Sequence, residues 1–222
     1  MSPLEKSVNN NSHNGAGWEI RFTSIDTARS LSQLAPPLKL RDKLSNESSL
    51  KIPDLVCLSH LRWNFVYQRP QHLLSRCAKN RRVFFVEEPV FSAGTDWRLD
   101  VSIHESGVWV IVPHLSEEIG EVTAQKIQQE MLNDLFKAAE IQQYLLWYYT
   151  PMAVGFTNHL KPLAVVYDCM DELSAFQGAH PNLKTNESEL LNRANVVFTG
   201  GYSLYEAKQH QHSNIHAFPS SI

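Results

Sequence analysis

The sequence has little basic charge and no long apolar run. The net charge is −3, whereas a nucleic-acid-binding domain usually carries a clustered basic face. No apolar run approaches the roughly 18 residues that cross a bilayer, and the amino terminus lacks the apolar core of a secretory signal. We therefore expect no nucleic-acid partner, no transmembrane segment and a cytoplasmic protein. Peripheral attachment at the inner membrane face stays open, although no basic amphipathic helix marks it.

The sequence also lacks the common motifs for cofactors and metals. A dinucleotide-binding fold needs G-x-G-x-x-G after its first strand, but the corresponding turn here holds Arg62 and Trp63 and no glycine. A Walker motif is missing too. Cys57, Cys77 and Cys169 have no metal-like spacing, and we expect them to be reduced thiols. The sequence thus predicts neither a cofactor nor a metal.

What is present is the composition of a globular protein with a core, because 43% of the residues are hydrophobic and 19% are charged. Residues 1–50 differ from the rest, with an Asn/Ser/Gly tract, the pair Pro36 and Pro37, and little periodicity. We interpret them as a disordered leader. Residues 51–222 are then a single domain.

In that domain short apolar runs alternate with helical patterns. Strands are predicted at 54–59, 82–89, 109–115, 143–151, 163–172, 195–201 and 215–221, with a weaker signal at 99–103. Helices are predicted after Pro70 and at 122–140, 152–160, 186–194 and 202–210. Continuous apolar strands that alternate with helices are typical of an α/β fold with an open, mostly parallel sheet and helices on both faces.

Polar groups follow the predicted strands, at the edge where ligands of open parallel sheets bind. They are His60, Arg62, Trp63, Gln68, Arg69, Glu87, Glu88, Asp168, Asp171, Glu172, Gly200, Gly201 and Ser203. Carboxylates accept hydrogen bonds from hydroxyls, arginine donates to phosphate or carboxylate, and aromatic faces stack on sugar rings. This set suits a polyhydroxylated ligand, although any parallel sheet has polar loop ends.

Asp168, Asp171 and Glu172 form the densest group of carboxylates. Crowding of like charges can raise a pKa and prepare a general base. The spacing is D-x-x-D rather than the D-x-D of metal-dependent transferases. The alternative is a helix start, with Asp171 as the N-cap and Glu172 in the first turn.

The residues Gly200, Gly201 and Ser203 stand between a predicted strand and a helix. Glycines there let a ligand approach the backbone closely, and a helix N-terminus favours an anion. A tight strand-to-helix turn explains the glycines equally well.

Several of these segments together resemble bacterial group 1 glycosyltransferases of the GT-B fold, in particular the teichuronic-acid-type branch with its W-x-x-x-x-Q-R-P motif. They are SHLRWNFVYQRPQHLLSR (59–76), VFFVEEP (83–89), VVYDCMDELSAF (165–176), ANVVFTGGYSLYEAK (194–208) and HAFPSS (216–221). The resemblance covers about residues 54–222 and implies a Rossmann-like N-terminal domain of such an enzyme.

The resemblance implies that this domain binds a sugar acceptor, while a C-terminal domain binds a nucleotide-sugar donor as substrate, usually without a metal. By that likeness Asp168 lies where many relatives place a polar or histidine group at the cleft. His60 and Arg62 lie in the loop that faces the donor, and Gly200, Gly201 and Ser203 line the acceptor side. The predicted catalytic residues are Asp168, Asp171 and His60, and the other ten bind substrate.

Relatives continue past F-P-S-S into a second α/β domain, whereas the sequence given ends at Ile222. We therefore expect a truncated or split hexosyltransferase that is inactive alone, with a separate chain as a candidate source of the donor domain. A non-catalytic module that binds a glycan or a partner, and a fragment of a sugar-nucleotide epimerase, are the alternatives. A downstream reading frame that encodes a second α/β domain would favour the transferase.

Overall fold

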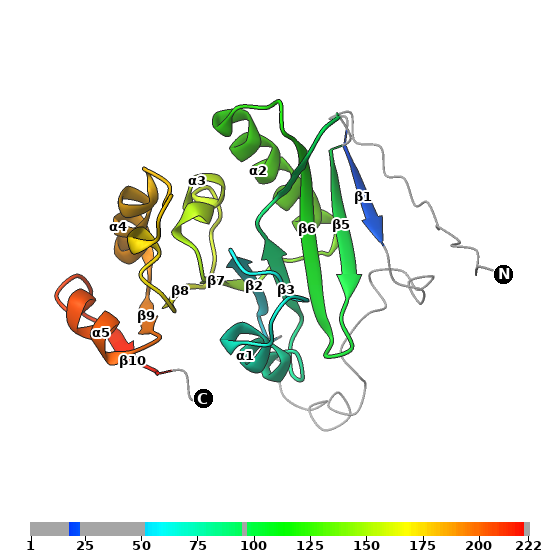
Figure 1. Cartoon of the computed structure of the whole chain (residues 1–222). Helices are drawn as coiled ribbons and strands as arrows, with labels where there is room; N and C mark the ends of the chain where they lie inside the picture. The colour runs from blue at the N-terminus through cyan, green and yellow to red at the C-terminus, as the bar shows by residue number, and fades with distance from the viewer. Residues whose placement is uncertain (1–17, 23–51, 95–96, 220–222) are drawn as a thin grey trace, which may run out of the picture.

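The computed structural model describes residues 18–22, 52–94 and 97–219, which form a sheet with helices packed on it (Figure 1). The strands are β1 (Glu19–Phe22), β2 (Asp54–Ser59), β3 (Val83–Glu87), β4 (Val90–Ser92), β5 (Arg98–Ile103), β6 (Val108–Ser116), β7 (Tyr144–Tyr148), β8 (Ala164–Cys169), β9 (Val196–Thr199) and β10 (Ile215–Ala217). The helices are α1 (Arg69–Cys77), α2 (Glu121–Ala138), α3 (Val154–Thr157), α4 (Leu183–Arg193) and α5 (Tyr202–Lys208), and the 3-10 turns are η3 (Pro151–Ala153) and η4 (Leu173–Ala175).

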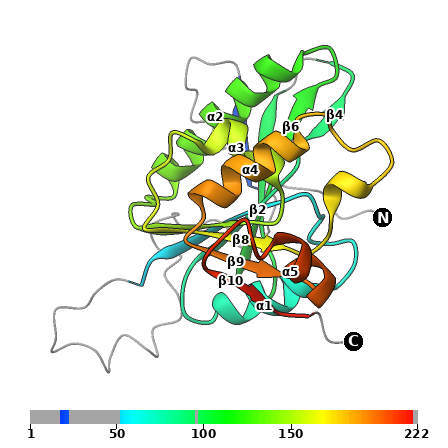
Figure 2. The same ribbon diagram turned by 90° about the vertical axis from the view of Figure 1, so that its left-hand side faces the viewer.

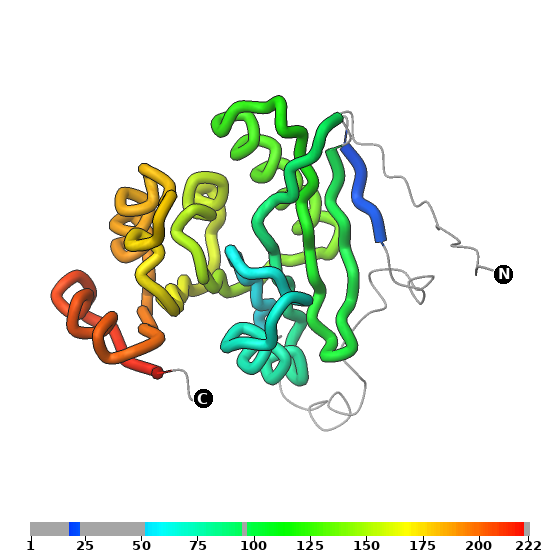
Figure 3. The backbone as a smooth tube through the Cα atoms, viewed as in Figure 1, coloured from blue at the N-terminus to red at the C-terminus, as the bar shows by residue number. Residues whose placement is uncertain are grey.

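The described strands follow the order β1-β5-β6-β3-β2-β7-β8-β9-β10, and β4 pairs with β6. Every pairing among them is parallel except that of β5 with β6. Figure 3 follows the chain from β1 at one edge to β10 at the other. The six strands from β6 to β9 have the 3-2-1-4-5-6 order of doubly wound folds, so the order reverses between β2 and β7. The predicted open, mostly parallel sheet is confirmed.

Two strands at one side of the sheet differ from the sequence prediction. Residues 19–22, expected within the disordered leader, form β1 and pair with β5, and Trp18 beside them is buried. The rest of the expected leader lies outside the described residues. β5 runs antiparallel to β6 because a tight turn reverses the chain, with Gly107 at φ 84 and its N–H donating to the carbonyl of His104 at 2.8 Å.

Both faces of the central sheet are covered, which explains why its strands are apolar without alternation. Val56 and Leu58 of β2 face the core under α2, α3 and α4, whereas Leu55 and Cys57 face a second core under α1. Figure 2 shows α2, α3 and α4 on one side of the strands and α1 on the other. All six residues of β2 are buried, as expected for a strand between two layers.

The helix that covers most of the first core is α2. Ile127, Met131 and Leu135 recur every four residues and are buried, which confirms the predicted amphipathic helix. The helix predicted at 152–160 is shorter in the structure, where η3 and α3 together begin at Pro151 and end at Thr157. Thr150 caps that turn by accepting a hydrogen bond from the N–H of Met152 at 3.3 Å.

A buried ion pair joins α5 to α4. The ammonium group of Lys208 contacts both carboxylate oxygens of Glu187 at 2.9 Å and one oxygen of Glu172 at 2.8 Å. The hydroxyl of Tyr167 donates to Glu187 at 2.7 Å. Burial would raise the pKa of Glu172, but hydrogen bonds from Lys208 and Ser174 outweigh it and lower that pKa. The cluster therefore links α4, α5 and the loop after β8 to one another and to β8 through Tyr167.

We expect Lys208→Met to destabilise the fold by about 3 kcal/mol, because it leaves the buried carboxylate of Glu187 without its counter-ion. Urea unfolding followed by circular dichroism measures this loss. Lys184→Met, an exposed lysine on α4, is the control and should change stability by less than about 0.5 kcal/mol. Equal stability of the two variants would show that the ion pair contributes nothing.

Candidate functional site

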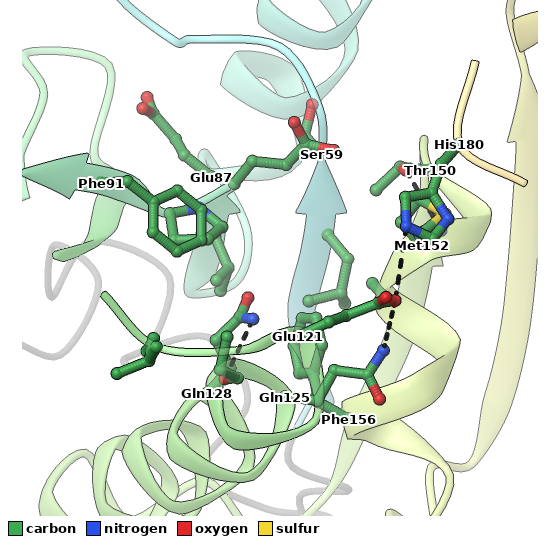
Figure 4. Close-up of a pocket in the computed structure, with 17 residues that line it drawn as sticks. Ser59, Glu87, Phe91, Glu121, Gln125, Gln128, Thr150, Met152, Phe156 and His180 are labelled. Carbon is green, nitrogen blue, oxygen red and sulfur yellow. Dashed lines mark hydrogen bonds and ion pairs between the residues drawn. The ribbon is translucent and has the colours of Figure 1, made fainter. Parts of the chain in front are cut away.

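A cavity of about 480 Å³ opens at the carboxyl ends of β2 and β3, on the side of the sheet that α2 covers (Figure 4). The start of α2 and the turn η3 form its other walls. It is lined by Leu58, Ser59, Val86, Glu87, Glu88, Pro89, Phe91, Ile119, Glu121, Ala124, Gln125, Gln128, Thr150, Met152, Ala153, Phe156 and His180. The cavity lies beside the point where the strand order reverses, which is where doubly wound folds bind ligands.

Polar side chains stand at the mouth of the cavity. Glu121 lies between His180 and Gln125 in Figure 4, with a carboxylate oxygen 3.5 Å from His180 Nε2 and 3.4 Å from Gln125 Nε2. Nothing in the sequence singles out these three residues as neighbours. His180 belongs to the loop before α4, and only the tertiary structure brings it to the start of α2. The helix periodicity of α2 shows which face is apolar, but it does not show that its first turns border a cavity.

His60 follows β2 directly and is held by the neighbouring strand. Its Nδ1 lies 3.0 Å from the carbonyl oxygen of Tyr149. Because a carbonyl only accepts, Nδ1 carries the hydrogen of this contact, so Nε2 is the nitrogen with the lone pair in the neutral tautomer. Among the described residues Nε2 has no hydrogen-bond partner. The imidazole is half-buried and is not among the residues that line the cavity, and the catalytic role of His60 stays a prediction.

Arg62 and Glu87 are paired with each other, and the Arg62 side chain stays 39% exposed. Arg62 Nη1 lies 3.0 Å from Glu87 Oε2, and the same guanidinium donates to the carbonyls of Glu88 and Pro89. Glu87 also accepts from the backbone N–H of Trp63 at 2.8 Å. The pair fixes the loop after β2 onto the end of β3.

Trp63 is a correction to the predicted substrate-binding set. Its side chain is 3% exposed and packs edge-to-face on Phe85, with ring centroids 5.0 Å apart. The ring therefore completes the core under α1 and offers no face to a sugar. Sequence reasoning missed this because a tryptophan in a polar loop looks the same whether the loop folds inward or outward.

Glu88 is the carboxylate at the cavity that the fold leaves unpaired. Burial raises the pKa of Glu88, although the positive fields of His60 and Arg62 oppose the rise. Among the described residues the Glu88 carboxylate has no hydrogen-bond or ion-pair partner, while the residue as a whole is exposed.

Asp168 is a second correction, because the predicted general base is 0% exposed. Arg69, in the first turn of α1, contacts both carboxylate oxygens at 3.0 Å, from Nε to Oδ2 and from Nη2 to Oδ1. Burial raises the pKa of Asp168, whereas Arg69 lowers it by favouring the ionised carboxylate. Tyr149 and Trp147 also favour the ionised carboxylate, but neither side chain forms a hydrogen bond to it. Arg69 also donates to the carbonyl of Phe218. The pair ties α1 to β8 and to the end of β10.

The predicted crowding of three carboxylates does not occur. Asp171 is exposed, Glu172 turns to Lys208, and Asp168 turns to Arg69 on the opposite face of the sheet. The N-cap of η4 is Glu172 rather than Asp171, and its side chain accepts from the Ser174 hydroxyl at 2.7 Å. The structure therefore does not bring these carboxylates together.

We expect Arg69→Met to destabilise the protein by about 3 kcal/mol at neutral pH, because it leaves Asp168 buried and charged. Without Arg69 the folded-state pKa of Asp168 rises further, so the folded protein binds the proton more tightly than the unfolded chain. The loss should therefore shrink as pH falls toward about 5. Urea unfolding at several pH values measures it.

The double variant Arg69→Met with Asp168→Asn is the control for that measurement. It should recover part of the stability and lose the pH dependence, since no buried charge remains. A pH-independent loss in the single variant would contradict the assignment of Asp168 as a structural partner of Arg69.

Gln68 and the glycine turn lie at two helix starts. Gln68 is the N-cap of α1, and its backbone N–H donates to the Gln71 side chain at 3.0 Å. Gly201 is the N-cap of α5, and Ser203 is exposed in its first turn. At Gly200 a Cβ atom would lie 2.4 Å from the carbonyl oxygen of Met170. Close packing on the neighbouring chain thus requires Gly200.

We expect Gly200→Ala to cost about 2 kcal/mol or more, because backbone atoms must move to admit the methyl group. Gly201→Ala is the matched control, since its Cβ meets nothing within 4 Å and its φ of −168 is open to any residue. Thermal unfolding of the two variants makes the comparison. Equal melting temperatures would contradict the packing argument.

Among the described residues, no group of three or more histidine, cysteine, aspartate and glutamate side chains gathers closely enough to hold a metal ion. A helix with the length and apolarity to cross a membrane is likewise not found in the described parts of the chain.

The architecture is that of a Rossmann-like α/β domain, and its cavity lies at the carboxyl ends of β2 and β3. A similar fold occurs in a solved GT-B glycosyltransferase structure described as trehalose-6-phosphate from E. coli bound with UDP-2-fluoro glucose, at 11% identity and a TM-score of 0.51. The match covers 76% of this chain and 49% of that one, so this chain spans about half the length of its neighbour. No family profile and no curated protein matches the sequence.

Proposed function

We propose that this domain is the acceptor-binding half of a hexosyltransferase that moves a sugar from a nucleotide sugar to a cell-envelope or exopolysaccharide acceptor. The cavity at the ends of β2 and β3 carries the proposal, because it combines apolar walls with hydrogen-bonding groups at the edge where doubly wound domains bind ligands. The likeness to a GT-B enzyme and the teichuronic-acid-type motifs support the same reading.

His60 is the proposed proton acceptor for the acceptor hydroxyl. Tyr149 orients the imidazole through Nδ1, and Nε2 stays free for the proton. Removing that proton makes the hydroxyl oxygen a better nucleophile toward the sugar carbon of the donor, whose bond to the diphosphate breaks as the nucleoside diphosphate leaves. Asp168 is too deeply buried for this role, and it instead fixes the first turn of α1.

The donor is proposed to bind mainly to a second domain that completes the cleft. A GT-B cleft closes around both substrates and excludes water, and the described residues supply only one of its walls. The domain alone should therefore bind acceptor glycosides without turning over a nucleotide sugar.

A non-catalytic module that binds a glycan or a partner is the second candidate. The internal pairing of Arg62, Arg69 and Asp168 favours it, because three residues expected to act on substrate are used within the fold. The free Nε2 of His60 favours the enzyme instead.

Calorimetric titration of the protein with phenyl glycosides of common hexoses, and with UDP-glucose and GDP-mannose, tests the proposal. We expect at least one glycoside to bind and both nucleotide sugars to bind weakly or not at all. Gln128→Trp, which fills the cavity from α2, should weaken glycoside binding at least about tenfold. Gln129→Trp, at the next position and outside the cavity, is the control. Tight binding of a nucleotide sugar would mean that this domain is the donor side.

A further inference from the structure

The cavity has apolar walls over much of its depth. Its apolar lining residues are Leu58, Val86, Phe91, Ile119, Met152 and Phe156. Phe91 is among the exposed large hydrophobic side chains of the molecule. A ligand that fills this space must therefore carry an apolar part of its own, such as an aglycone or the apolar face of a sugar ring.

The charges on the cavity lining are of one sign apart from a histidine. Glu87, Glu88 and Glu121 line it, and no lysine or arginine is among the described residues that do so. His180 shares the carboxylate of Glu121 at 3.5 Å. The Glu87 carboxylate is paired with Arg62, whereas Glu88 has no hydrogen-bond or ion-pair partner among the described residues, although the positive fields of His60 and Arg62 reach it.

Neither of the two arginines that the sequence predicted to bind substrate, Arg62 and Arg69, is among the described residues that line the cavity. Arg62 is occupied by Glu87 and two backbone carbonyls, and Arg69 by Asp168 and the carbonyl of Phe218. Arg69 is 10% exposed and contacts both oxygens of Asp168, so it would have to leave that carboxylate to bind a phosphate. An anion in the cavity would thus meet carboxylates without a cation to offset them.

From these observations we propose that the cavity selects acceptors by charge: it takes a sugar with an apolar substituent, prefers one that carries an amino group, and rejects a phosphorylated one. The inference rests on the proposed function, since it names the substrate class of the same site. Glu88, which has no partner among the described residues, is the residue assigned to receive the ammonium group.

The test uses the tightest-binding phenyl glycoside and two derivatives that carry an amino group or a phosphate in place of the primary hydroxyl. At about pH 7.5 the amine is protonated. We expect the amino derivative to bind about tenfold more tightly than the parent glycoside, and the phosphate at least about tenfold more weakly. Both differences should shrink at high salt, because the mouth of the cavity is open to screening.

Glu88→Gln and Glu121→Gln identify the source of the selection. Each should reduce the ratio of the affinity for the amino derivative to the affinity for the uncharged parent, both measured with the same variant. Glu206→Gln, an exposed glutamate on α5, is the control and should retain the full preference. A preference that survives both cavity variants would overturn the assignment to these carboxylates.

The outcomes separate the two proposals. Equal or tighter binding of the phosphate derivative overturns the charge selection while leaving the acceptor site intact. Failure of all three compounds to bind overturns the acceptor site itself. Binding in the expected order, lost in Glu88→Gln, supports both.

Discussion

The structure depends on the burial of β2 between two layers. All six of its residues are buried, and it pairs with β3 on one side and β7 on the other. A strand in that position must satisfy its backbone within the sheet and its side chains against helices on both faces. The strand order reverses beside β2, and the cavity and His60 lie at the carboxyl end of that strand.

The ion pairs near that edge connect elements of the fold to one another. Arg69 holds α1 on β8 through Asp168, Arg62 holds the loop after β2 on β3 through Glu87, and Lys208 joins α4 to α5. Each pair compensates a carboxylate that the sheet has taken out of water. What remains for binding is a cavity with apolar walls, a few amide and hydroxyl groups, and carboxylates at its mouth.

The regular elements were predictable because each is encoded locally. The apolar runs of β2, β3 and β8 and the four-residue repeat of Ile127, Met131 and Leu135 need no knowledge of the rest of the chain. Residues 19–22 were not predictable as a strand, since four residues with little apolar pattern form one only by pairing with β5, which is remote in sequence. The antiparallel direction of β5 likewise depends on the turn at Gly107.

The sequence by itself determined the α/β class, the position of most elements and the edge at which polar groups gather. Only the tertiary structure decided which of those groups are free. It buried Trp63 and Asp168, separated Asp171 and Glu172 from them, and brought His180 beside Glu121. The physical reason is that periodicity reports which side of an element is apolar, whereas availability to a ligand depends on partners that are remote in sequence, such as Arg69 and Asp168.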